Sequence, residues 1–138
     1  MNRRTLLVSA LTMAAAMNAS CAEKTVMMDI VVFNYWPRPV NDVFINKHFA
    51  GLAEASGPGD DVGGGGMVAG VPVTPGKQVV KWMLDGPRNA PRLGETVTAS
   101  FDLPTIPMGH STLVINIYPD GTVFLETGKY ISQPRLQK

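Results

Sequence analysis

A run of four glycines, residues 63–66, constrains this chain more than any other stretch. Small and β-branched residues follow it, and glycine has no Cβ, so another backbone or a bulky ring can approach this segment closely. A phosphate-binding loop would need a Lys-Ser or Lys-Thr pair and then a helix, because helix N–H groups form its anion site. Val71-Pro72-Val73 follows the glycines instead. The run therefore predicts close packing or a flexible loop, and no nucleotide site.

The rest of the chain reads as short apolar and β-branched runs separated by turn residues. Fourteen glycines and eleven prolines punctuate it, and no apolar run after the first twenty residues shows a helical period. Such a pattern predicts an all-β fold, an antiparallel β-sandwich or partly open barrel of about seven short strands. The predicted strands are 25–35, 40–45, 67–73, 77–84, 95–102, 111–118 and 122–127.

Two turns are specific enough to predict by themselves. Pro119-Asp120-Gly121 separates two β-rich runs and predicts a hairpin, since Gly121 can adopt positive φ. Asn46-Lys47 predicts a tight turn that leads into a second hairpin arm at 48–51, because Asn tolerates the left-handed conformation. Residues 52–56 could form one helical turn, and 128–131 could add an edge strand.

The first twenty residues are predicted to be a secretory signal peptide, followed by a single β-sandwich domain at 21–138. A basic start at Arg3 and Arg4 precedes an apolar run and then small residues. Cys21 lies at the cleavage position, where a lipoprotein would carry its acylated first residue, although ordinary cleavage that removes Cys21 also fits. Because Cys21 is the only cysteine, the exported chain cannot form an internal disulfide.

Charge excludes some kinds of partner. Without Arg3 and Arg4, ten basic side chains oppose eleven acidic ones, so there is no basic stripe for nucleic acid. No long apolar segment remains after the signal, so membrane attachment would come only through lipid on Cys21.

No catalytic, metal or cofactor motif stands out. Asp60 and Asp61 lack the alternating oxygen ligands and distal Glu of a calcium loop. His48 and His110 are the only histidines, and two isolated histidines do not make a zinc site. No Ser lies in a Gly-x-Ser-x-Gly elbow. We therefore expect no enzyme, no metal and no cofactor.

The two tryptophans are the strongest aromatic candidates. Trp82 lies inside a predicted strand and is expected in the core. Trp36 lies at a proline-bounded turn beside Arg38, and Trp and Arg are enriched at binding hot spots. Trp36 could cover one end of the hydrophobic core, or it could contact a binding partner.

Several segments resemble a bacterial family of exported, mostly lipid-anchored proteins that is catalogued as a domain of unknown function. The similar segments are 34–40 (Asn-Tyr-Trp-Pro-Arg-Pro-Val), 43–46 with Gly51, the glycine run, Pro75-Gly76, 79–82 (Val-Val-Lys-Trp) and the 112–126 hairpin. Where the family often has a cysteine pair, this chain has Ala69 and Gly70, so a disulfide or metal there is excluded.

The resemblance implies a function, because some relatives are regarded as immunity proteins of type VI secretion lipase effectors. On that basis we expect a periplasmic protein, anchored to the outer membrane through Cys21, whose protein partner is a secreted lipase. The expected contacts are the Trp36–Arg38 turn, His48, Phe49 and the 52–61 loop, with Asp60 and Asp61. The alternative is an envelope β-domain that binds a glycan or another envelope protein, and the glycan version requires an exposed Trp36.

Overall fold

A computed structural model describes residues 24–58 and 62–131, and this part of the chain is all β, without a helix. The predicted β-sandwich is therefore confirmed, with nine strands in place of about seven. The strands are β1 (Val26–Asn34), β2 (Val40–Ile45), β3 (His48–Ala53), β4 (Gly63–Gly64), β5 (Val68–Val73), β6 (Gly76–Leu84), β7 (Thr96–Leu103), β8 (Thr112–Ile117) and β9 (Val123–Gly128).

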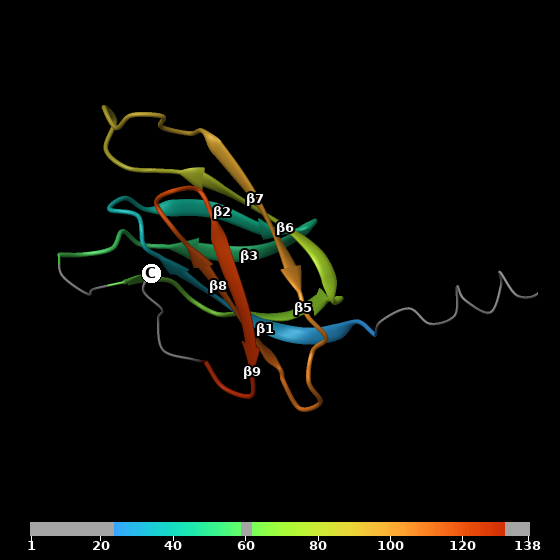
Figure 1. The fold of residues 1–138 in the computed structure, drawn as a ribbon. Helices are drawn as coiled ribbons and strands as arrows, with labels where there is room; N and C mark the ends of the chain where they lie inside the picture. The colour runs from blue at the N-terminus through green and yellow to red at the C-terminus, as the bar shows by residue number, and fades with distance from the viewer. Residues whose placement is uncertain (1–23, 59–61, 132–138) are drawn as a thin grey trace, which may run out of the picture.

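The strands form two sheets that pack face to face (Figure 1). One sheet has the order β4-β1-β8-β9, and β5 pairs with the same edge of β1 as β4 does. The other sheet has the order β3-β2-β6-β7. Within the described residues the chain passes between the sheets four times, after β1, β3, β5 and β7. Pro75, which has no backbone N–H, lies at the crossing between β5 and β6.

The core lies between the sheets and follows from period-two alternation along the strands. In β6, Gln78, Val80, Trp82 and Leu84 are all buried, whereas the residues between them are half-buried or exposed. Trp82 has no exposed surface, as the sequence predicts. Around Trp82 the core consists mostly of Val, Ile and Leu side chains, together with Met28 and Trp36.

One pairing differs from the antiparallel expectation, since β1 and β8 run parallel from Asp29↔Thr112 to Asn34↔Ile117. All six residues of β8 are buried, and β1 is nearly as apolar. Strands covered on both faces are usually continuous apolar runs, and these two runs fit that pattern.

Both predicted turns are confirmed. Asn46 has a φ of 55°, and Ile45 pairs with His48 across it. Gly121 has a φ of 84° in the turn between β8 and β9, where the Tyr118 N–H bonds the Thr122 carbonyl at 3.0 Å.

Two local predictions are wrong. Residues 52 and 53 extend strand β3 instead of forming a helical turn, because the backbone of this segment lies against the glycine run: the Glu54 N–H donates to the Gly64 carbonyl at 3.1 Å. The segment after Gly128 does not add an edge strand, because the chain bends at 129–130, and the Thr112 hydroxyl donates to the Tyr130 carbonyl.

Of the two outcomes predicted for the glycine run, close packing or a flexible loop, the structure shows close packing, and only at alternate positions. A Cβ on Gly63 would lie 1.8 Å from the Glu54 carbonyl oxygen, and one on Gly65 would lie 2.0 Å from that of Leu52. A Cβ on Gly64 or Gly66 would meet nothing within 4 Å. Residues 63 and 65 therefore let the chain lie against the end of β3.

The predicted signal peptide and Cys21 lie outside the described residues, as do Asp60 and Asp61. The exported single domain, its cleavage and its lipidation stay predictions.

Candidate functional site

The most exposed aromatic pair lies on the outer face of the β2–β3 hairpin. Phe44 and Phe49 face each other across the two strands, with ring centroids 5.8 Å apart in an edge-to-face arrangement. Their exposed fractions are 37% and 46%, although each ring contacts the other. Because both side chains point away from the core, the hairpin presents them to solvent on a rigid support.

Leu52 and Met67 extend this apolar surface along the edge of the sheet. Both side chains are about half exposed. Leu52 follows Gly51, and a Cβ at Gly51 would lie 3.6 Å from Val68 and 3.9 Å from the Gly66 carbonyl, so the two segments are adjacent. We call Phe44, Phe49, Leu52 and Met67 the β3 surface. His48, which is also exposed, lies beside Phe49 at the start of β3.

Of the predicted contact residues, His48 and Phe49 therefore lie on an exposed apolar surface, and part of the 52–61 segment joins them. Sequence reasoning missed Phe44 and Met67. The turn at Asn46 would have identified Phe44, since a two-residue turn that pairs 45 with 48 also places 44 opposite 49.

The Trp36–Arg38 turn lies at the opposite end of β2 from His48 and is held from within. Asn34, which is fully buried, donates to the carbonyls of Arg38 at 2.7 Å and Glu54 at 2.9 Å. Its side-chain oxygen accepts from the Trp36 N–H at 3.0 Å. This amide closes the turn and ties it to the end of β3.

Arg38 also bonds within the molecule. Its Nε donates to the Asp85 carbonyl at 2.8 Å, and Nη1 donates to the Pro91 carbonyl. Asp85 in turn accepts from the Asn41 side chain and bonds the Pro39 carbonyl through its own N–H. Arg38 thereby fastens the loop between β6 and β7 onto the start of β2.

Trp36 is buried, with 9% of its surface exposed, and it packs in the hydrophobic core. It offers no flat aromatic face to solvent. A sugar-binding platform therefore cannot be built on Trp36, and the glycan alternative loses the residue on which it depended.

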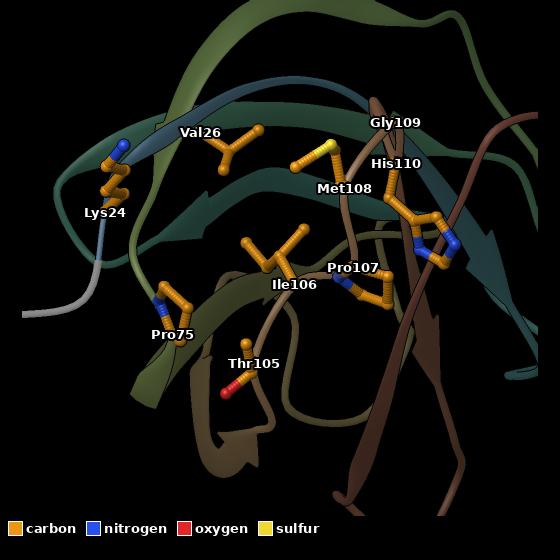
Figure 2. Close-up of a pocket in the computed structure, with 9 residues that line it drawn as sticks. All are labelled: Lys24, Val26, Pro75, Thr105, Ile106, Pro107, Met108, Gly109 and His110. Atoms are coloured by element: carbon orange, nitrogen blue, oxygen red, sulfur yellow. The ribbon is translucent and has the colours of Figure 1, made fainter.

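A shallow groove of about 490 Å³ lies at another place, where the start of β1 meets the loop between β7 and β8. Figure 2 shows Ile106, Pro107 and Met108 from that loop together with Lys24 and Val26 from the start of β1. His110 lies at its edge, and its Nδ1 lies 2.9 Å from the Thr127 hydroxyl.

Ionisable groups are sparse and mostly exposed. Arg92 and Glu95 form a bidentate pair at 2.8 Å, and the hydrogen bond from Arg92 lowers the pKa of the Glu95 carboxyl below its usual value. Both groups are solvent-exposed in the loop after β6, so the pair adds little to stability. Within residues 24–58 and 62–131, no three His, Cys, Asp or Glu side chains are placed to hold a metal ion. Nor does this part of the chain contain a helix of the length and apolarity that crossing a bilayer requires.

Comparison with models of known families, with curated proteins and with solved structures gives no match for this chain. The family resemblance of the sequence therefore stays a prediction.

Proposed function

We propose that this protein is a periplasmic immunity protein, which binds a secreted lipase effector through the β3 surface and blocks it. The observation that favours binding by contact is the exposed Phe44–Phe49 pair beside Leu52 and Met67. Monomeric proteins seldom leave large apolar side chains gathered on one rigid face unless that face meets a partner. The signal-like N-terminus supports the proposed export to the periplasm, and the family resemblance supports the proposal that the partner is a lipase.

The β3 surface has the features of an interface core. Aromatic residues and Met are enriched at such cores, and a few buried aromatic anchors supply most of the binding free energy. Phe44 and Phe49 are already ordered against each other, so little side-chain entropy is lost when a partner covers them. His48 would lie at the polar rim, next to Phe49.

The test is co-purification with a type VI secretion lipase effector, together with protection of cells that receive that lipase in the periplasm. Phe44→Ala combined with Phe49→Ala is expected to weaken binding by at least about 2 kcal/mol and to abolish protection. Leu93→Ala, at a similarly exposed apolar residue of the β6–β7 loop, is the matched control and should bind normally. Absence of binding by the unchanged protein at micromolar concentration would reject the proposal.

The alternative partner is another envelope protein, which would use the same surface. Capture of an envelope protein that depends on Phe44 and Phe49, without any lipase binding, would favour that alternative.

A further inference from the structure

One end of the sandwich gathers the start of β1, the β5–β6 turn, the β7–β8 loop and the end of β9 (Figure 1). The hydroxyls of Thr25 and Thr74 lie 2.6 Å apart, which joins the start of β1 to the β5–β6 turn. Thr112 at the start of β8 pairs with Gly128, which joins the β7–β8 loop to the end of β9. We call this the β1-start end, and the groove described above opens on it.

The two most exposed large apolar or aromatic side chains of the described residues lie here. Met108, at the tip of the β7–β8 loop, is 99% exposed, and Tyr130 is 83% exposed just after β9. Ile131 is about half exposed. None of these side chains contributes to the core, so the packing of the fold does not explain why they are apolar.

Exposed lysines lie at the same end of the sandwich. Lys24 lines the groove and is exposed, and Lys129 is exposed beside the loop, with its Cε 3.5 Å from the place a Cβ of Gly109 would occupy. Lys47 is exposed in the turn after β2, which lies near the β5–β6 turn because Asn46 bonds Gln78 and Gln78 bonds the Thr74 carbonyl.

Within the described residues, two carboxylates lie near these lysines. The groove lining contains no carboxylate. Asp102, on β7, is paired in register with Lys77 on the outer face of the other sheet. Asp29, in register with Thr112 at the start of β8, also lies at this end and is half-buried. Among the described residues of this end, the four lysines Lys24, Lys47, Lys77 and Lys129 outnumber the carboxylates of Asp29 and Asp102, so the described part of the β1-start end is cationic. It also carries an exposed methionine and tyrosine.

We propose that the β1-start end is a membrane-contacting surface that binds the headgroup region of an anionic phospholipid bilayer. Lysines are attracted to the negative surface potential while their aliphatic stems stay on the apolar side. Met108 and Ile131 enter the boundary between headgroups and acyl chains, and Tyr130 occupies the interfacial level that tyrosine prefers.

The position of Cys21 agrees with this orientation. Only two residues, Ala22 and Glu23, separate it from Lys24, so the Cα atoms of Cys21 and Lys24 can lie at most about 11 Å apart. A lipid on Cys21 would hold this same end against the bilayer, and the two weak attachments would reinforce each other. This reinforcement by a lipid anchor rests on the proposed function and its lipid-anchored location, whereas the surface contact itself does not.

A site-specific probe tests the contact, because Cys21→Ser leaves the chain without a cysteine and without a lipid attachment site. In that background, Met108→Cys carries an environment-sensitive fluorophore, and Leu93→Cys in the β6–β7 loop carries the same label as control. Vesicles of phosphatidylglycerol and phosphatidylethanolamine should shift the emission of the label at position 108 to the blue. Phosphatidylcholine vesicles should not, and the label at position 93 should not respond to either.

Charge reversal tests whether Lys24 and Lys129 contribute to membrane binding. Lys24→Glu with Lys129→Glu should raise the lipid concentration for half-maximal shift by roughly tenfold or more. Lys81→Glu with Arg88→Glu changes the net charge equally, at exposed positions away from this end. This control should change the lipid concentration for half-maximal shift by less than about twofold. All four positions are exposed, and equal thermal midpoints verify that the variants fold.

No shift at position 108 with anionic vesicles, an equal shift at position 93, or an equal effect of the two charge reversals would each overturn the proposal. The assay contains no lipase and no lipid anchor. Failure of membrane contact and failure of the immunity function are therefore separate results.

Discussion

Single residues decide where backbones can meet in this protein. Asn34 is a buried amide that satisfies two carbonyls and one N–H of neighbouring segments, so it fixes the turn before β2. Gly63 and Gly65 act in a different way, because the absence of a side chain lets another backbone lie against them. Both kinds of residue hold the end of β3 against the edge of β1.

The glycine packing predicts a sharp alternation of mutational effects. Gly63→Ala and Gly65→Ala should each lower the free energy of unfolding by at least about 2 kcal/mol, because a rigid backbone carbonyl occupies the place of the new Cβ. Gly64→Ala and Gly66→Ala should stay within about 1 kcal/mol of the unchanged protein, as their Cβ positions are open. Urea unfolding measures all four, and similar losses at all four positions would contradict close packing at 63 and 65.

Elements are joined by side chains of the connecting segments as well as by ladder hydrogen bonds. The loop between β6 and β7 is a long, exposed connection, yet Arg38 from the turn before β2 bonds carbonyls near both of its ends. Asp85 adds a bond to the Pro39 carbonyl. The loop thus has a defined place beside the start of β2.

If Arg38 holds the loop, Arg38→Lys should loosen it, because an ammonium lacks the planar fork that reaches two carbonyls in different directions. Amide hydrogen exchange of residues 85–94 is expected to accelerate several-fold, while exchange in β1 and β8 stays unchanged. Arg88→Lys, an exposed change in the same loop, is the control. Uniform acceleration across the strands would instead indicate global destabilisation.

On the scale of the whole molecule, two edge-to-face phenylalanine pairs have different tasks. Phe101 on β7 and Phe124 on β9 have ring centroids 5.4 Å apart, and they connect the edges of the two sheets. Phe101 also packs against the core. Phe44 and Phe49 lie within one sheet and face solvent.

Alanine substitution should lower the free energy of unfolding more in the Phe101–Phe124 pair than in the Phe44–Phe49 pair. Phe101→Ala is expected to cost about 2 to 3 kcal/mol of unfolding free energy, since it removes core packing and a contact between sheets. Phe44→Ala should cost less than about 1 kcal/mol, because the ring is exposed on one side. Chemical denaturation followed by tryptophan fluorescence provides both values. Equal costs would mean that the β3 surface is needed for folding, which would weaken its assignment as a binding surface.

The sequence alone determined the β class, most strand positions and the turns at Asn46 and Gly121, because β-propensity, period-two alternation and turn chemistry act over a few neighbouring residues. It also indicated that Trp82 is buried, and it left close packing and a flexible loop as the two alternatives for the glycine run. Only the tertiary structure decided that β1 pairs in parallel with β8, that alternate glycines are contacted, that residues 52 and 53 are strand, and that Trp36 is buried while Phe44 is exposed. Each of these depends on which segments, tens of residues apart, meet across the sandwich, and no local pattern specifies that choice.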